Sequence, residues 1–263
     1  MCGTLLNQFS MSEHEGYLRV ASTEQPSWWD EELARQSQSF MTVLAEDGDE
    51  LREVGRVGGL GKGEQIYAVR FIGDVSYVVT FRQVDPLYTV DLSDPTNPRV
   101  RGELKILGFS AYLHPVGDGL LLGVGQDATG QGRVRGTQIS LFDISDLDDP
   151  TRPHAGGLGQ DTHSDVEYDH HAFLWWPVRS LAVLPVSGYS FDERAGETWA
   201  SSAIGAEVAR DRGIERVGSV SHPGREPVRR SLVIGDRLFT VSEAGVMANL
   251  LSAWDERRWV PFP

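Results

Sequence analysis

The sequence predicts an all-β protein built from copies of one four-stranded unit. An apolar hairpin followed by an apolar strand pair with an acidic turn occurs in residues 67–104 and returns in residues 112–158. The two hairpin turns, at Gly73 and Gly117, lie 44 residues apart. Such units stack on one another because a single copy cannot bury its own apolar face. We therefore expect a β-propeller of about five four-stranded blades.

Composition and charge narrow the class of protein. The chain has 263 residues, of which 40% are hydrophobic and 24% charged, and its 29 glycines indicate a folded, turn-rich domain. A formal net charge of -14 argues against binding to nucleic acid, which needs a clustered basic surface. The lone Cys2 excludes an internal disulfide bond. We recognise neither a signal sequence nor an apolar run long enough to span a membrane.

The hairpins come first in each unit. They are predicted at residues 9–20, 71–79, 113–122, 172–184 and 232–241. Glycine in most of these turns supplies the positive φ that a tight hairpin requires. The copy at 172–184 lacks the Gly-Asp turn and the copy at 9–20 turns at Glu15 and Gly16.

The second strand pair of each unit follows its hairpin. These pairs are 39–44 with 51–57, 87–91 with 99–104, 139–143 with 154–158, 206–209 with 214–220, and 250–254 with 258–260. The resulting single domain spans residues 1–263, with blades at 4–60, 64–106, 109–160, 164–222 and 228–263. Insertions at 24–38, 127–136 and 188–202 are expected to be surface loops, with short helical turns at 31–35 and 199–206.

Two arrangements of the blades stay open. The five blades could close into a small ring, or they could form an open arc of a larger propeller with an exposed edge strand. A two-layer sandwich is a poorer alternative, because it gives no reason for the same hairpin to recur.

Four ordered segments carry a resemblance to a known family. They are IYAVRFIGDVSYVVTFRQVDPLYTVDLSDPTNP at 66–98, GFSAYLHP at 108–115, EYDHHAF at 167–173 and RRSLVIGDRLFTVSEAGV at 229–246. Together they resemble the bacterial β-propeller-domain family of secreted proteins, whose C-terminal propeller is distantly related to WD40 repeats. The resemblance implies a secreted or cell-surface protein of which this chain is the C-terminal part. It implies no reaction or cofactor.

Ionisable residues alternate with others from Asp161 to His171. An extended strand would project them from one face, where carboxylate and imidazole groups could hold calcium or zinc. The candidate ligands are His163, Asp165, Asp169 and His171. The competing interpretation is a solvated edge, favoured by repulsion between the carboxylates. No cofactor is predicted.

The acidic turns at 91–94 and 143–148 also suggest calcium, but they lack the glycine and the terminal glutamate of an EF-hand loop. Asp and Ser are equally the residues with which a turn caps its own backbone, and we expect that role.

Charged residues in the predicted inner strands are candidates for a channel site. The first strand of each blade lines the channel of a propeller, so polar residues there gather around one axis. A ring of Arg70, Arg229 and Arg230 facing Asp169 and His170 would bind an anion or form ion pairs between blades. Arg82, just beyond the second strand of its hairpin, is a further candidate, and Asp85, Tyr112 and His114 are weaker candidates for the same rim.

The sequence therefore favours a non-catalytic binding or scaffold module with a protein or glycan partner. Residues 108–112 and 123–128 imitate a hydrolase elbow and a dinucleotide loop, but neither has the required helix context. Two alternatives stay open: a channel-centred metal-dependent hydrolase, and a truncated propeller without an independent function. Trp28 and Trp29, in a polar insertion, are expected to be exposed and to anchor a binding partner. Trp175 and Trp176 are expected to pack between blades.

Overall fold

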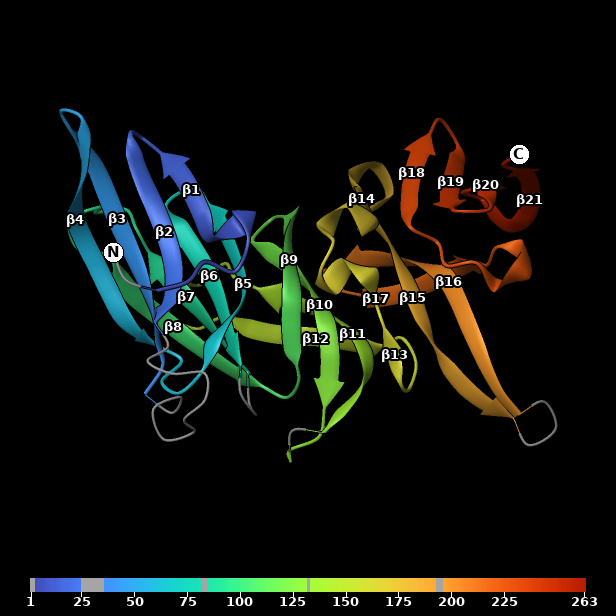
Figure 1. The fold of residues 1–263 in the computed structure, drawn as a ribbon, viewed down its shortest axis with the longest axis horizontal. Helices are drawn as coiled ribbons and strands as arrows, with labels where there is room; N and C mark the ends of the chain where they lie inside the picture. Colours follow the sequence, from blue (N-terminus) through green and yellow to red (C-terminus); the bar gives the residue numbers. More distant parts are fainter. Residues whose placement is uncertain (1–2, 25–35, 82–84, 132, 193–195) are drawn as a thin grey trace. The chain divides into compact units, whose positions relative to one another are not determined.

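The computed structural model describes residues 3–24, 36–81, 85–131, 133–192 and 196–263. Within these ranges the chain forms 21 strands in five antiparallel sheets, and its helical segments are short 3-10 turns (Figure 1). The prediction of an all-β chain with five blades is confirmed.

The sheets follow the chain in order. The first contains β1 (Met11–His14), β2 (Tyr17–Glu24), β3 (Gln38–Asp47) and β4 (Glu50–Leu60). The second contains β5 (Gln65–Ile72), β6 (Val75–Phe81), β7 (Asp85–Asp91) and β8 (Arg99–Ile106). The third contains β9 (Phe109–Gly117), β10 (Leu120–Ala128), β11 (Val134–Asp143) and β12 (Thr151–Gly157). The fourth contains β13 (Thr162–His163), β14 (Leu174–Trp176), β15 (Leu181–Asp192), β16 (Gly196–Ala209) and β17 (Gly213–Val220). The fifth contains β18 (Arg230–Ile234), β19 (Arg237–Ser242), β20 (Gly245–Leu250) and β21 (Ala253–Pro261).

Short 3-10 turns connect or precede some strands. They are η1 (Gln8–Ser10), η2 (Asp165–Glu167), η3 (His170–Ala172), η4 (Pro177–Arg179) and η5 (Pro223–Arg225).

The chain divides into two compact units. The first comprises residues 1–121, 128–133 and 142–151, and the second comprises residues 122–127, 134–141 and 152–263. The first two sheets therefore belong to the first unit and the last two to the second, while the third contributes to both. The extent of a single domain over 1–263 stays a prediction.

The predicted hairpins form as the sequence indicated. In the second sheet Ile72 pairs with Val75 across a two-residue turn, in which Gly73 has a φ of 53°. In the fifth sheet Ile234 pairs with Arg237 around the equivalent Gly-Asp turn. These turns place β-branched and aromatic residues in the flanking strands, where they suit a half-buried pleated surface.

The acidic turns cap their own backbone, as predicted. One oxygen of Asp91 accepts hydrogen bonds from the backbone N–H and the hydroxyl of Ser93, at 3.0 and 2.7 Å. Asp143 accepts the same pair from Ser145, at 3.1 and 2.6 Å. The repeated Asp-x-Ser spacing is therefore explained by turn geometry.

Within each unit, consecutive sheets pack against each other through apolar clusters. Within the first unit one cluster joins the first and second sheets and includes Met41, Leu60 and Val78. Within the second unit another cluster joins the fourth and fifth sheets and includes Val183 and Leu238. Trp176 lies partly buried against that second cluster, in agreement with its predicted packing role. Removal of these side chains from water is the main force that holds each pair of sheets together.

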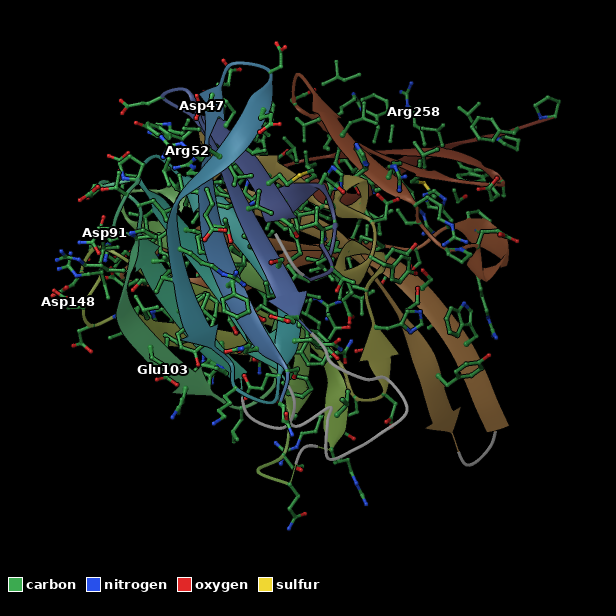
Figure 2. The ribbon with its side chains drawn as sticks, turned by 60° about the vertical axis from the view of Figure 1, so that its left-hand side comes forward. Asp47, Arg52, Asp91, Glu103, Asp148 and Arg258 are labelled. Atoms are coloured by element: carbon green, nitrogen blue, oxygen red, sulfur yellow. The ribbon has the colours of Figure 1, made fainter. Side chains whose placement is uncertain are left out.

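Two glycines mark where one blade meets the next within the first unit. A Cβ at Gly55 would lie 2.2 Å from the carbonyl oxygen of Pro95, and a Cβ at Gly102 would lie 2.4 Å from that of Leu147. The acidic turn of the following blade thus packs directly against a glycine in the last strand of the preceding blade, β4 or β8. Beside Gly102, Arg101 bridges Asp91 of its own blade and Asp148 of the next, and Figure 2 labels both carboxylates.

Part of the insertion prediction is wrong. Residues 188–202 are not a loop: Gly188 pairs with Ala200 and Asp192 with Gly196, so β15 and β16 continue as a long ribbon. The predicted helical turn at 199–206 is strand β16 for the same reason. Pairing to a neighbouring strand satisfies the backbone here and overrides a composition typical of loops. The predicted turn at 31–35, Trp28 and Trp29 lie outside the described residues.

Candidate functional site

The segment between β13 and β14 carries most of the predicted site residues, but it is not extended. After His163 the backbone forms η2 and η3, so the alternation from Asp161 to His171 does not project from one face of a strand. The Ser164 side chain caps η2, and the Glu167 carboxylate accepts a hydrogen bond from the Ser164 backbone N–H. This Ser-x-x-Glu capping box is a sequence signal for a helical start that the alternating charges concealed.

Two arginines at the start of the fifth sheet, Arg229 just before β18 and Arg230 as its first residue, pair with two carboxylates of this segment. Arg229 donates to Oδ2 of Asp165 at 2.8 Å, and Arg230 donates to Oδ2 of Asp169 at 2.6 Å. The other oxygen of Asp165 accepts the Tyr168 hydroxyl at 2.6 Å. Of the two roles expected for Arg229 and Arg230, the structure shows ion pairs between neighbouring blades.

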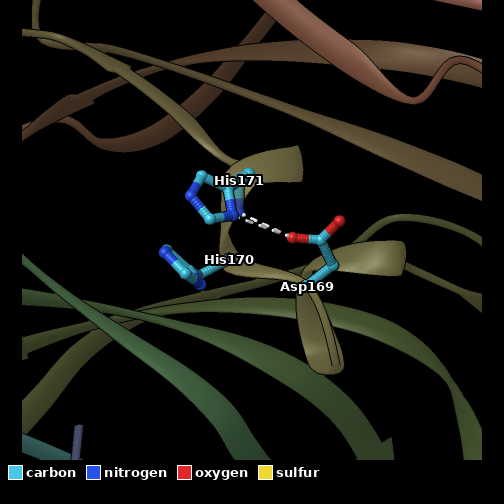
Figure 3. A group of neighbouring side chains, drawn as sticks. All are labelled: Asp169, His170 and His171. Atoms are coloured by element: carbon cyan, nitrogen blue, oxygen red, sulfur yellow. Dashed lines mark hydrogen bonds and ion pairs between the residues drawn. The ribbon is translucent and has the colours of Figure 1, made fainter. Parts of the chain in front are cut away.

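Asp169, His170 and His171 form a compact group (Figure 3). Each offers one ligand atom, and these atoms all lie within 4.8 Å of one another. Oδ1 of Asp169 accepts the His171 backbone N–H at 3.0 Å and lies 3.3 Å from His171 Nδ1. Partial burial raises the pKa of the Asp169 carboxyl, but the bonds from the His171 N–H and from Arg230 outweigh it, so the net shift is downward. The Asp169 carboxylate is therefore ionised at neutral pH.

The predicted metal ligands divide between separate environments. Asp169 and His171 belong to the group in Figure 3, and His170 joins them. Asp165 is held by Arg229 and Tyr168 instead. The His163 ring packs on Trp199, with ring centroids 5.6 Å apart.

Arg70, Tyr112 and His114 lie together in the first unit. Arg70 Nε donates to the Leu113 carbonyl at 2.8 Å, and the guanidinium covers the rings of Phe9 and Tyr112, 4.0 and 5.3 Å from their centroids. The Tyr112 hydroxyl lies 3.0 Å from His114 Nδ1. Burial, followed by the charge of Arg70, lowers the pKa of His114 to about 4. His114 is therefore neutral at physiological pH.

The remaining channel predictions stay predictions. Arg70 belongs to the first unit, whereas Arg229 and Arg230 belong to the second, so their common ring is not established. Asp85 begins β7, opposite Ile106. Arg82 lies outside the described residues.

An aromatic surface that the sequence did not predict lies on the β15–β16 ribbon. Tyr189 and Trp199 are direct cross-strand partners and pack edge to face with centroids 4.9 Å apart. His163 contacts the same indole, and Tyr189 is 57% exposed. We call His163, Tyr189 and Trp199 the ribbon aromatic surface. No sequence signal revealed it, because the pairing depends on residues assigned to a loop.

Successive antiparallel sheets of four or more strands, packed through their apolar faces, define the β-propeller class. The sequence pattern of the family described as "Beta propeller domain" matches residues 1–254, and the chain belongs to that family. No helix among the described residues is long and apolar enough to cross a membrane.

Two relatives and one solved structure are similar to this chain. An uncharacterized protein of Archaeoglobus fulgidus is 45% identical over 196 residues, which cover 74% of this chain and 28% of that protein. The uncharacterized protein MJ1554 of Methanocaldococcus jannaschii is 37% identical over 257 residues, covering 98% and 36%. The chain thus spans about a third of the length of these relatives. The structure of Chaetomium thermophilum Sqt1 bound to the N-terminus of ribosomal protein L10 is similar with a TM-score of 0.45 and 12% identity, covering 94% of this chain and 71% of that one.

Proposed function

We propose that this chain is a non-catalytic β-propeller module of a secreted or cell-surface protein and that it binds a protein partner. The observation that carries the proposal is the ribbon aromatic surface, with Tyr189 more than half exposed beside Trp199. Tyrosine and tryptophan are enriched at protein interfaces and supply much of the binding energy there. Holding them outside the core favours a surface used for recognition.

The backbone around this surface also favours a peptide partner. The last residue of β15 that pairs with β13 is Gly188, and the first residue of β16 that pairs with β17 is Ala203. Between these points, among the described residues, the ribbon has two strands and two open edges (Figure 1). An extended peptide can add to such an edge through main-chain hydrogen bonds while its side chains contact the neighbouring rings. A glycan lacks the regular backbone donors and acceptors that this mode uses.

The alternative of a metal-dependent hydrolase has weaker support at Asp165. A general base needs a carboxylate free to accept a proton. Both carboxylate oxygens of Asp165 are already bonded, one to Arg229 and one to Tyr168. These bonds favour a structural role for this residue.

Photo-cross-linking tests the binding proposal. The purified chain carrying a photoreactive phenylalanine analogue at Tyr189 is incubated with envelope and secreted fractions of its native cells. The matched control carries the analogue at Val178, which is 77% exposed in the same unit. We expect a discrete cross-linked protein from position 189 that Trp199→Ala abolishes. Equal products from both positions would contradict the proposal, as would substrate turnover that depends on Asp165.

The location is tested separately. The secreted or cell-surface setting is proposed from the family resemblance, and it predicts that the full-length protein in its native cells is accessible to externally added protease. Protection of the protein until the cells are lysed would contradict that setting.

A further inference from the structure

We propose that Asp169, His170 and His171 form a binding site for a zinc-class divalent metal ion. The three residues are consecutive and cluster together (Figure 3). They lie at η3, which contacts β18 of the fifth sheet. The site differs from the ligand set that alternation suggested, since it adds His170 and omits His163 and Asp165.

The spacing of the donor atoms suits a small metal ion. In a tetrahedral zinc site with bonds of about 2.0–2.1 Å, neighbouring ligand atoms lie about 3.3–3.4 Å apart. Asp169 Oδ1 and His171 Nδ1 are 3.3 Å apart, so this pair already has the required separation. The widest separation in the group is no more than 4.8 Å. To bring the two most distant donor atoms to the separation of a zinc site, they must approach each other by about 1.5 Å. Rotation of the imidazole rings at this partly exposed site can provide that movement.

The carboxylate is oriented for this role. Arg230 holds Oδ2 of Asp169 at 2.6 Å, and Oδ1 is left toward the imidazole rings. Metal ligands typically depend on such partners behind them, which fix their orientation. The Asp169 side chain also caps η3 through the His171 N–H, so its position is set before any ion arrives. A metal on Oδ1 would leave the bond to Arg230 intact.

The donor set selects the kind of ion. Two imidazoles and one carboxylate suit zinc, nickel or copper, whereas calcium and magnesium prefer oxygen ligands alone. The His171 side chain is 69% exposed, so an ion can reach the site from solvent. Three protein ligands leave a fourth position for water or for a group on another molecule.

The site would connect two blades of the second unit. Asp169 lies in the connection of the fourth sheet, and Arg230 is the first residue of β18 in the fifth. An ion that fixes Asp169 therefore also fixes the position of the carboxylate that contacts β18. This predicts a metal-dependent rise in thermal stability, which does not require any partner or activity.

The test is metal binding to the untagged, chelator-treated chain with Cys2→Ser, because a thiolate would compete for zinc. Zn²⁺ is titrated by calorimetry, and Co²⁺ is used as a spectroscopic probe of imidazole coordination. We expect one equivalent of Zn²⁺, and at least a tenfold weaker affinity in His170→Ala and in His171→Ala. Arg230→Gln should weaken binding by about tenfold, since partners of ligands typically contribute that much.

The controls are His163→Ala and Asp165→Asn, which remove the ligands that the sequence suggested and should bind like the parent chain. Circular dichroism confirms that each variant is folded. Absence of stoichiometric binding in the parent chain would overturn the proposal. It would equally be overturned by unchanged affinity in the His170 and His171 variants, or by loss of binding in His163→Ala.

Discussion

Gly102→Ala tests the contact between consecutive blades most sharply. Gly102 has ordinary extended geometry, so an alanine there would be strained only by its neighbours. The added Cβ would lie 2.4 Å from the Leu147 carbonyl oxygen and 2.6 Å from Pro150 Cδ. Ordinary contacts begin near 3.4 Å, so the turn of the following blade must retreat by about 1 Å.

That movement has a cost that can be bounded. Overpacking a well-packed site destabilises the folded state by about 1–3 kcal/mol. Replacing a strand glycine by alanine offsets roughly 0.5–1 kcal/mol of this, because alanine loses less conformational entropy on folding. The retreat also disturbs Thr89, whose hydroxyl donates to the Leu147 carbonyl at 2.5 Å and accepts from the Gly102 N–H at 2.8 Å. We expect a net loss of about 1–3 kcal/mol in the free energy of unfolding.

Urea unfolding followed by tryptophan fluorescence measures this loss. The matched control is Gly157→Ala in the exposed strand β12, where a Cβ meets nothing within 4 Å. It should be as stable as the wild type or slightly more so. Wild-type stability of Gly102→Ala, or an equal loss in the control, would show that the following turn does not rest on this glycine.

Two further predictions concern buried polar groups of the first unit. Thr89→Val keeps the shape of a fully buried side chain but removes the hydrogen bonds of its hydroxyl, and should cost about 1–3 kcal/mol in urea unfolding. A loss below about 0.5 kcal/mol would contradict the assigned bonds. The pKa of His114, lowered from 6.5 to about 4 by burial and Arg70, means that the unfolded chain takes up a proton before the folded chain does. Stability should therefore fall as pH drops from about 6.5 to about 4, by roughly 2–3 kcal/mol through this group. His114→Gln should lose that part of the pH dependence. His171→Gln, a change at an exposed ring, is the control for removing a histidine. Identical pH profiles of stability for His114→Gln and the wild type would refute the assignment.

The fold was predictable because local signals agreed with the packing. Gly73 and Gly235 recur at hairpin turns, and Asp91 and Asp143 recur at capped acidic turns. Each signal is local, so it can be read without knowing which residues meet in space. The interblade role of Gly102 could not be read in this way, because its partner lies 45 residues further along the chain.

The candidate sites were predictable only in part, for two physical reasons. The alternation from Asp161 to His171 imitated a strand, but the capping box at Ser164 and Glu167 and the cap at Asp169 turn the backbone into η2 and η3. Arg230 and Asp169 were both expected to face the propeller channel, and the structure joins them by a hydrogen bond. Tyr189 and Trp199 meet only because the insertion continues as a paired ribbon, and pairing between strands is not a local property.

The affinity of the partner captured at Tyr189 is the most direct measurement of the central claim, that this propeller recognises protein through its ribbon. Tyr189→Ala and Trp199→Ala should each weaken that affinity by at least about thirtyfold, which corresponds to the 2 kcal/mol of an interface hot spot. Val178→Ala should bind like the wild type. Unchanged affinity in both ribbon variants, with the fold intact, would contradict the account.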